Sequence, residues 1–390
     1  MAQMAAVQPL RVLQVLGNAI VGGMETYVER LVSHLAADEV EVFCVCPFES
    51  PLTLRLRNMG IPVSIVRMSE DCSWNALQLV CALVRRHGIG IIHCHLANAH
   101  LLGALTGKLT DVPVLATVHG RTLSALDFEV QRTTDTFLVT VCEGAYLHAL
   151  GLGVPDNRLF MIPNGVDTRL FGGKDYQNGL HEILGLAAST RLVGFVGRLS
   201  PEKGPEVFVR SAATAIAAGT DAHFVLIGEG PMKAMLARMV KHAGLDQRVH
   251  FAGPQREMNQ LYPGLACVVS SSHSEGMPLA VMEAMASARP VIGTNVGGIA
   301  ELIEQGETGY LVPAGDSDAI AAHLDTLLSD EELRQRFGRR ARDRVMERFP
   351  FEQSASRVQA LLRSLTNKKA GARVGVVSKA VLERSESKVS

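Results

Sequence analysis

Short apolar runs of strand length alternate with helical stretches along this chain, and the alternation occurs twice. In the first half, the apolar runs are residues 10–16, 40–46, 63–66, 91–95, 114–118 and 136–142. Stretches with helical periodicity, such as 24–37 and 74–87, fall between them. Because strands of a parallel sheet are joined by helical crossovers, this pattern predicts a doubly wound α/β domain.

The same pattern begins again in the second half, with apolar runs at 191–196, 223–227, 248–254, 265–269 and 290–293. Helical periodicity then continues from 316 to about 349, and an amphipathic helix is expected at 352–365 after Pro350. A chain of 390 residues is too long for one ordinary core. We therefore predict two Rossmann-like doubly wound domains, residues 1–170 and 171–350, followed by a last helix at 351–366.

Composition excludes several classes of protein. The net charge is −1, with 47% hydrophobic and 20% charged residues, so nothing global points to nucleic acid. No apolar run approaches the roughly 20 residues of a membrane helix, and no signal peptide is evident at the start. We expect a cytoplasmic protein whose seven cysteines are reduced thiols.

The last segment, residues 367–390, has a different composition. Six basic residues against two acidic ones leave a charge of +4 there, and the hydrophobic content falls. This composition is typical of a disordered, solubilising tail. Weak attraction to an anionic membrane surface is the alternative.

Ligands of parallel sheets bind at the carboxyl ends of the strands, so the residues there are candidates for a site. The first turn reads G-N-A-I-V-G-G-M-E-T, which lacks the G-x-G-x-x-G fingerprint of dinucleotide binding. This turn is either a ligand-binding loop at a strand end or a plain tight turn. The candidates at the strand ends of the first half are Gly22, Gly23, His95, His119 and Glu143.

Two cations flank the turn that follows the strand at 191–196. Arg198 and Lys203 precede a helix that begins at Pro205. A guanidinium fork and an ammonium point charge at a helix start are suited to a diphosphate. The alternative is a surface loop with an arginine–glutamate pair, which would contribute no more than about 1 kcal/mol.

The segment 270–290, SSSHSEGMPLAVMEAMASARP, carries two glutamates around a helix start. Glu275 and Gly276 lie in the loop, a helix is predicted to open at Pro278, and Glu283 lies within it. Both carboxylates reach one ligand only if it sits over the helix N-terminus, which suits an anion. The alternative is a solvated helix face with a capping acid.

A metal site is the other alternative that the sequence raises. His93 and His95 point to one side of a strand, and His100 follows them. No acid stands at ligand spacing, and no C-x-x-C pair occurs. We therefore expect no metal site, with His95 lining the binding site and His93 packed in its strand.

Four motifs together resemble the retaining glycosyltransferases of family 4 (glycosyl transferases group 1), which have the GT-B fold. They are E-G-x-P-x-x-x-x-E from Glu275, Gly-Arg…Glu-Lys-Gly from Gly197, Ile-Pro-Asn-Gly-Val-Asp from Ile162, and Gly-Gly-x-Glu from Gly22. The resemblance spans roughly residues 10–365 and is denser in the second half. It implies two domains facing a central cleft, the second holding a nucleotide-diphosphate sugar and the first offering the acceptor. It also implies that the last helix, 351–366, crosses back to the first domain.

The resemblance also implies roles for residues of this chain. Arg198 and Lys203 would clamp the pyrophosphate, Glu275 would bind sugar hydroxyls and Glu283 the ribose. His119 would face the transferred sugar, so the expected catalytic set is His119, Glu275, Arg198 and Lys203. Further contacts to the donor are expected from Gly22, Gly23, Gly197, Gly228, Gly276, Met277, Pro278 and Leu279.

The expected reaction is transfer of a sugar to an acceptor hydroxyl with retention of anomeric configuration, without metal or cofactor. The acceptor would be a saccharide or lipid-linked saccharide in bacterial polysaccharide or glycolipid synthesis, with peripheral association at the inner face of the cell membrane. Two alternatives stay open. One is another GT-B enzyme on nucleotide sugars, such as an epimerase or phosphorylase, and the other is a non-catalytic, two-lobed sugar-binding protein.

Overall fold

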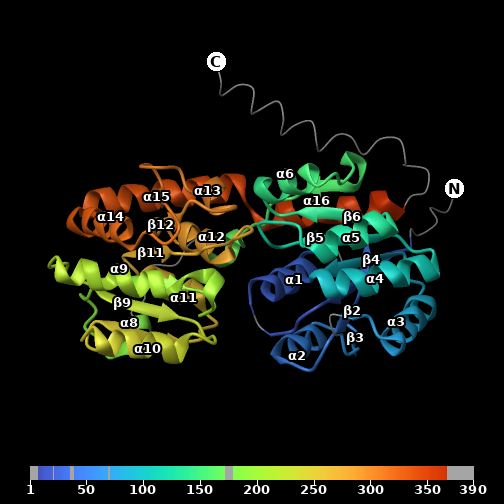
Figure 1. Ribbon diagram of the computed structural model, residues 1–390, viewed down its shortest axis with the longest axis horizontal. Helices are drawn as coiled ribbons and strands as arrows, with labels where there is room; N and C mark the ends of the chain where they lie inside the picture. Colours follow the sequence, from blue (N-terminus) through green and yellow to red (C-terminus); the bar gives the residue numbers. More distant parts are fainter. Residues whose placement is uncertain (1–7, 21, 36–38, 69–70, 172–178, 367–390) are drawn as a thin grey trace, which may run out of the picture. The chain divides into compact units, whose positions relative to one another are not determined.

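The computed structural model describes residues 8–20, 22–35, 39–68, 71–171 and 179–366. The chain forms two compact units, Met1–Pro163 with Glu352–Ser390, and Asn164–Phe351 (Figure 1). The division thus falls after Pro163 rather than after residue 170, because Val166 exchanges backbone hydrogen bonds with Phe349 and Phe351, each 2.9 Å long. The basic tail at 367–390 lies outside the described residues.

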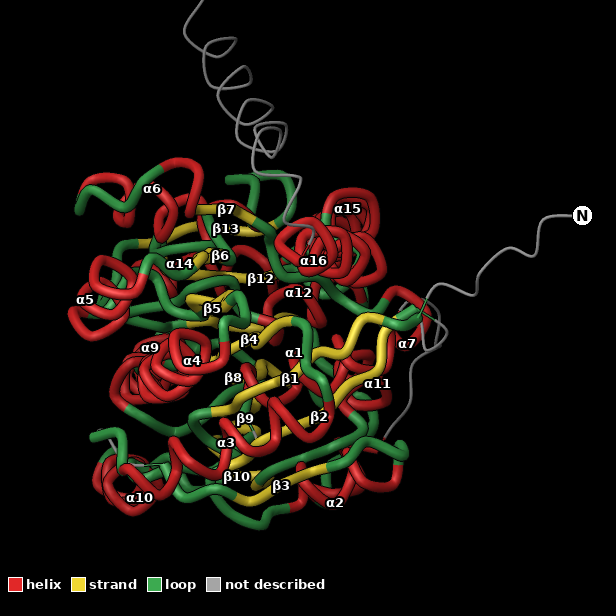
Figure 2. The backbone as a smooth tube through the Cα atoms, turned by 90° about the vertical axis from the view of Figure 1, so that its right-hand side faces the viewer, coloured by secondary structure: helices red, strands yellow, loops and turns green. Residues whose placement is uncertain are grey.

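The N-terminal unit is built on a seven-stranded parallel sheet with the order β3-β2-β1-β4-β5-β6-β7, which Figure 2 shows from β3 at the lower edge to β7 at the upper edge. Its strands are β1 (Leu10–Leu16), β2 (Val40–Cys46), β3 (Val63–Ile65), β4 (Ile91–His95), β5 (Val114–Val118), β6 (Phe137–Thr140) and β7 (Leu159–Met161). Val12 of β1 stands beside Val42 on one flank and Ile91 on the other. The strand order reverses at β1, and such switch points create a binding crevice at the carboxyl ends.

Helices cover both faces of this sheet. They are α1 (Gly23–His34), α2 (Pro51–Asn58), α3 (Trp74–His87), α4 (Ala97–Thr110), α5 (Ala125–Thr134) and α6 (Glu143–Gly151), with a 3₁₀ turn η1 (Asp156–Arg158). Serine caps begin three of them: Ser50, Ser73 and Ser124 each accept a bond from a backbone N–H three residues on. The last helix, α16 (Phe351–Thr366), joins this unit through Ser354, which donates to the carbonyl of Pro163 at 2.8 Å.

The C-terminal unit holds a six-stranded parallel sheet with the order β10-β9-β8-β11-β12-β13. Its strands are β8 (Leu192–Val196), β9 (His223–Ile227), β10 (Val249–Gly253), β11 (Cys267–Ser270), β12 (Val291–Thr294) and β13 (Gly309–Val312). Its helices are α7 (Thr168–Phe171), α8 (Gly179–Leu184), α9 (Pro205–Ala217), α10 (Lys233–His242), α11 (Met258–Leu261), α12 (Leu279–Ala286), α13 (Ile299–Leu302), α14 (Ser317–Ser329) and α15 (Glu331–Arg348), with 3₁₀ turns η2 (Pro201–Lys203) and η3 (Tyr262–Gly264).

Both predicted parallel sheets are confirmed, and the differences lie at edges and ends. Strands β7 and β13 were not predicted from the sequence, because both are short edge strands without a long apolar run. The helix expected to open at Pro278 begins one residue later, since Pro278 has an extended backbone (ψ 121°) and serves as the N-cap.

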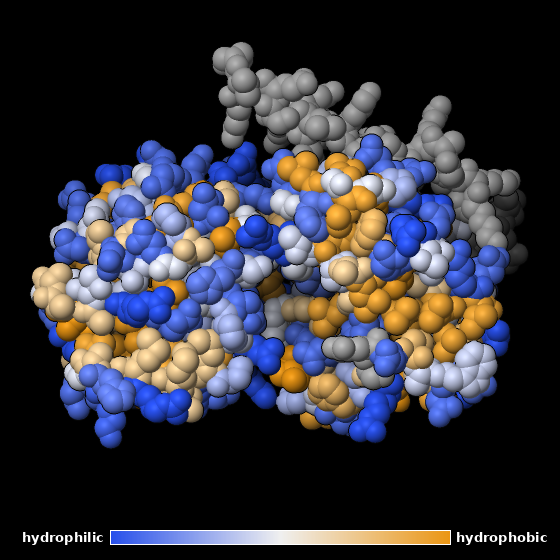
Figure 3. Space-filling view, viewed as in Figure 1, coloured by the Kyte–Doolittle hydropathy of each residue, from blue (hydrophilic) through white to orange (hydrophobic). Residues whose placement is uncertain are grey.

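No helix within the described ranges is long and apolar enough to cross a membrane. Apolar side chains nevertheless gather on the surface of the N-terminal unit, over α4 and α6 (Figure 3). Leu109 at the end of α4 is 53% exposed, and Leu147 and Leu152 on and after α6 are 55% and 41% exposed. This apolar surface lies on the unit that is expected to bind the acceptor.

Candidate active site

The two loops that the sequence singled out in the C-terminal unit are bound to each other. The backbone N–H groups of His273 and Ser274 donate to the carbonyl of Glu202 at 2.9 and 3.2 Å, and Ser271 Oγ donates to the carbonyl of Gly204 at 2.8 Å. Gly204 has φ 59°, and a Cβ there would lie 2.2 Å from the Ser271 oxygen, so only glycine fits. The loop after β8 and the loop after β11 therefore form one structure.

Lys203 and Glu275 meet in this structure. Lys203 Nζ lies 2.7 Å from each carboxylate oxygen of Glu275. Ser272 Oγ donates to the same carboxylate at 2.7 Å, and Glu275 is only 8% exposed. A buried carboxylate is stabilised by such charge-assisted bonds, so the pair fixes the position of both predicted site residues.

Arg198 lies at the carboxyl end of β8, directly after Gly197, and its side chain is exposed. The N–H of Gly197 donates to Ile227, the last residue of β9, and Gly228 follows that residue. The Arg198 guanidinium makes no hydrogen bond or ion pair with another residue that the structure describes. Its five donors are therefore available to an anion at this strand end.

Glu283 lies on α12, the helix that follows the loop of Glu275. It is 7% exposed, and the hydroxyl of Tyr262 lies 3.3 Å from its carboxylate. The loop that precedes α12 is held at two points: Gly298 N–H donates to Gly276 at 2.6 Å, and Asn164 Nδ2 donates to Met277 at 2.9 Å. Pro278 and Leu279 continue this loop into the helix, whose first N–H groups have no partner within the helix.

Gly297 closes the site from the side of β12. It has φ 49°, and a Cβ at this position would lie 1.9 Å from the carbonyl oxygen of Glu275. Any larger residue would displace the loop that carries Glu275. The structure thus places Arg198, Lys203 and Glu275 in the loops that follow β8 and β11, and Glu283 in the helix α12 that follows the second of these loops.

In the N-terminal unit, histidines form a buried chain at the carboxyl ends of β4 and β5. His95 Nδ1 lies 2.9 Å from His119 Nε2, and His95 Nε2 lies 2.9 Å from Gln14 Oε1. Burial lowers the pKa of His119 well below its usual value, and burial together with His93 and His119 does the same for His95. Both rings are therefore neutral near pH 7.

The orientation of Gln14, the last residue of this hydrogen-bonded series, determines which ring nitrogens of His95 and His119 carry protons. In the orientation with Gln14 Oε1 toward His95, which leaves Gln14 Nε2 without a hydrogen-bond partner among the described residues, His95 Nε2 carries the proton and His95 Nδ1 accepts. His119 must then donate from Nε2, so its Nδ1 is left as an acceptor. Gln14 was not among the residues predicted from the sequence, and a polar residue inside the apolar run 10–16 was its only signal.

Gly22 and Gly23 stand at the start of α1, where Gly22 is the N-cap. The adjacent carboxylate belongs to Glu25, which is 3% exposed and accepts from Asn18 Nδ2 at 3.0 Å. A Cβ on Gly22 would come within 3.0 Å of that carboxylate, whereas Gly23 faces open space. The two glycines leave the backbone accessible beside a fixed acid.

The histidines that raised the question of a metal have other partners. His93 Nε2 lies 2.8 Å from Thr117 Oγ1, and His100 bonds to Asp127 and Thr136 at 2.9 and 2.8 Å. Within the described residues, no group of three or more histidines, cysteines or acids is placed to hold a metal ion.

Comparisons with known families and proteins cover most of the chain. Residues 21–170 match the family model described as Glycosyltransferase Family 4, and residues 177–344 match the model of Glycosyl transferases group 1. D-inositol 3-phosphate glycosyltransferase of Corynebacterium glutamicum is 28% identical, over 91% of this chain and 94% of that protein. N-acetyl-alpha-D-glucosaminyl L-malate synthase of Bacillus anthracis is also 28% identical, over 72% of this chain and 76% of that protein.

Solved structures agree on the fold. HepE of Anabaena, crystallised with UDP-glucose, superposes with a TM-score of 0.80 at 20% identity, over 90% of this chain and 99% of that one. A glycosyltransferase of Rickettsia africae gives a TM-score of 0.81 at 17% identity, over 93% and 100%. Two parallel-sheet units and two adjoining family models lead to one conclusion: the chain is a glycosyltransferase of family 4, in the glycosyl transferases group 1, with the GT-B fold.

Proposed function

We propose that this protein transfers a sugar from a nucleoside diphosphate sugar to an acceptor hydroxyl, with retention of configuration at the anomeric carbon. The observation that carries the proposal is the exposed Arg198 guanidinium beside Lys203, which is paired with the buried carboxylate of Glu275. HepE, which shares the fold, was crystallised with UDP and with UDP-glucose. A donor of this kind has a diphosphate for the cations and sugar hydroxyls for the carboxylate.

The chemistry follows from where charge develops. Negative charge grows on the diphosphate as the glycosidic bond breaks, and fixed positive groups that face this charge lower the barrier. Arg198 would bind the phosphate oxygens through its fork, while Lys203 contacts both the phosphate and Glu275. Glu275 would then hold the sugar hydroxyls and Glu283 the ribose, and we propose that no metal ion is needed because these cations neutralise the leaving group.

The N-terminal unit would hold the acceptor and the reacting face of the sugar. His119 presents Nδ1 as an acceptor and a backbone carbonyl at the end of β5, both suited to a hydroxyl. Gly22 and Gly23 beside Glu25 offer a second place for hydroxyl groups or a phosphate. The proposed acceptor is a saccharide or a lipid-linked saccharide.

We also propose peripheral association with the membrane, as a lipid-linked acceptor requires. The exposed leucines over α4 and α6, with Lys108 beside Leu109, suit a surface of apolar chains and anionic headgroups. Sedimentation with vesicles of phosphatidylglycerol tests this point. Leu109→Ser with Leu147→Ser should release the protein, and equal sedimentation of both forms would contradict it.

The main test is transfer activity over a panel of nucleoside diphosphate sugars and acceptors. Arg198→Ala should lower kcat/KM about 10²- to 10³-fold, the usual effect of removing one stabilising group. Arg210→Ala is the matched control, because Arg210 is exposed on α9 but lies beyond the loop. Equal activity of both variants would refute the assignment.

The same assay separates the alternatives. Proton NMR of the product reports the anomeric configuration, and activity after treatment with a chelator reports metal independence. Incubation of the donor without an acceptor distinguishes an epimerase, which would convert it, from a transferase. A non-catalytic sugar-binding protein would bind free sugar in calorimetry and ignore nucleoside diphosphates.

A further inference from the structure

A cavity of about 420 Å³ opens in the C-terminal unit at the edge of the sheet opposite to the donor loops. Its walls include Leu192, the first residue of β8, Ala266 just before β11, and Pro290 just before β12. These residues mark the amino ends of the strands, whereas Arg198 and Glu275 follow their carboxyl ends. The volume falls within the range of small-molecule sites.

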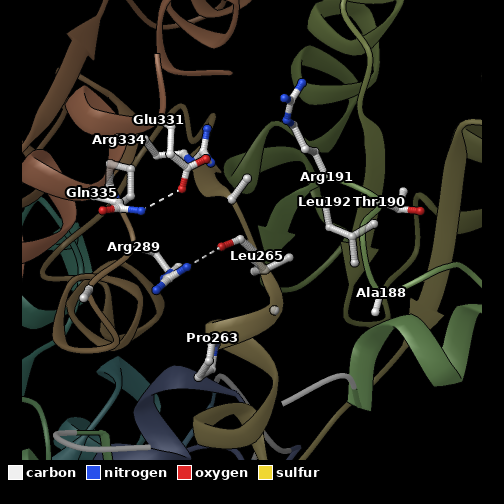
Figure 4. A pocket seen from close by; sticks show the side chains of 14 residues that line it. Ala188, Thr190, Arg191, Leu192, Pro263, Leu265, Arg289, Glu331, Arg334 and Gln335 are labelled. Carbon is white, nitrogen blue, oxygen red and sulfur yellow. Dashed lines mark hydrogen bonds and ion pairs between the residues drawn. The ribbon is translucent and has the colours of Figure 1, made fainter. Parts of the chain in front are cut away.

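Three arginines line this cavity, and each comes from a different segment (Figure 4). Arg191 precedes β8, Arg289 follows α12 and Arg334 lies in the first turns of α15. Glu331 is the only acidic residue among the lining residues. Three guanidinium groups against one carboxylate leave two positive charges around the cavity (3 − 1 = 2).

Internal contacts hold Arg289 in place without neutralising its charge. Arg289 donates to the carbonyls of Leu265 and Ser287 at 3.0 and 3.1 Å, and neither partner carries a charge. Burial lowers the pKa of Arg289, and repulsion by Arg334 lowers it further. The positive charges of Arg289 and Arg334 therefore repel each other across the cavity lining.

The charges of the other two arginines, Arg334 and Arg191, both act on the carboxylate of Glu331. Arg334 forms an ion pair with Glu331, which is mostly exposed, and donates to the Leu327 carbonyl at 3.2 Å. The charge of Arg191 acts on the same glutamate, but its side chain makes no hydrogen bond or ion pair with any residue in the described part of the chain. An anion would complete this arrangement.

The lining also has an apolar part. Leu192, Pro263, Leu265 and Pro290 line the same cavity as the three arginines. A doubly charged phosphate matches the two excess charges and the fork geometry of arginine. The carbon skeleton of a small ester would contact the apolar wall. We propose that this cavity is a second ligand site of the protein, which binds the phosphate group of a small phosphate monoester.

Calorimetry on the full chain, in a phosphate-free buffer, tests the proposal with sn-glycerol 3-phosphate and with glycerol. The phosphate ester should bind with one site per chain and glycerol should not bind. Arg191→Gln should weaken binding at least about ten-fold, because a hydrogen bond to a charged group is lost. Arg336→Gln is the matched control, since Arg336 is exposed on α15 but outside the lining.

A second variant separates this site from the donor site. Arg198→Ala with Lys203→Ala removes the cations of the donor loops and should leave the affinity for sn-glycerol 3-phosphate unchanged, whatever the fate of the proposed transfer reaction. The proposal is overturned if the ester fails to bind at concentrations up to about 10 mM, or if this double variant abolishes binding while Arg191→Gln does not.

The phosphate ester has two chemical sources, a free metabolite or a lipid headgroup. Vesicles of phosphatidic acid in phosphatidylcholine distinguish them. Sedimentation that depends on Arg191 would assign the site to a lipid headgroup. Binding of the free ester without such sedimentation would assign it to a small molecule, and both results support a phosphate site.

Discussion

Lys203 Nζ lies 2.7 Å from both carboxylate oxygens of Glu275, although the two residues are 72 positions apart in the chain. One residue was expected to bind phosphate and the other to bind sugar. Under the proposed function, the phosphate and sugar subsites would share a charge pair before any donor arrives. A donor phosphate that approaches Lys203 would then meet an ammonium whose position is already set by a buried acid.

Loss of one member of this pair should destabilise the fold. Lys203→Met would leave the Glu275 carboxylate buried without a cation, at a cost of about 2 kcal/mol, less than for a fully buried pair because Lys203 is partly exposed. Lys203→Met with Glu275→Gln should cost less than the sum of the single changes, since glutamine still accepts from Ser272. Urea unfolding measures this coupling, and strictly additive effects would contradict it.

Gly297→Ala should damage donor binding through the backbone. The added Cβ would lie 1.9 Å from the Glu275 carbonyl oxygen and push the loop aside. A misplacement of this kind lowers kcat/KM about 10²-fold. Gly306→Ala is the matched control, because Gly306 also has a positive φ, 75°, but faces open space. Similar losses in both variants would mean that backbone strain, not loop displacement, is responsible.

The stability of the fold should fall as the pH drops below about 6.5, the pKa of an unfolded histidine. Burial, with repulsion from His119, lowers the pKa of His93 to about 3 in the folded protein. Between these values the unfolded chain binds a proton and the folded chain does not, so each such histidine removes about 1.4 kcal/mol of stability per pH unit.

Chemical unfolding at several pH values measures this slope. His93→Gln should reduce the slope by the contribution of one proton, about 1.4 kcal/mol per pH unit. An unchanged slope in His93→Gln would show that the imidazole of His93 is protonated in the folded state.

The proton order of the histidine chain is open to NMR. Nitrogen-15 spectra of labelled histidine should show His119 protonated at Nε2 and bare at Nδ1, because Gln14 Oε1 fixes the tautomer of His95. Gln14→Leu removes that acceptor and should mix the tautomers of His119, whereas Gln14→Glu keeps an acceptor and the tautomer. A proton on His119 Nδ1 in the unaltered protein would contradict the order.

Much of the fold follows from local pattern. Buried strands of parallel sheets are apolar throughout, so the runs at β1, β4, β5, β8 and β9 stand out, and the helices between them require parallel pairing. Strand ends also predict where ligands bind, which is why Arg198 and Glu275 were identified. Local pattern did not predict β7 and β13, since a short strand at the edge of a sheet needs no apolar run.

The sequence by itself determined the two sheets, the loops at their carboxyl ends and the kinds of side chain that those loops carry, because periodicity and turn residues act over a few positions. Only the tertiary structure decided which of these side chains contact one another. Gln14 and His95 are 81 positions apart, and neighbouring strands β1 and β4 bring them together. The three arginines that line the cavity come from distant segments in the same way, since contacts between such segments depend on strand order and register rather than on local pattern.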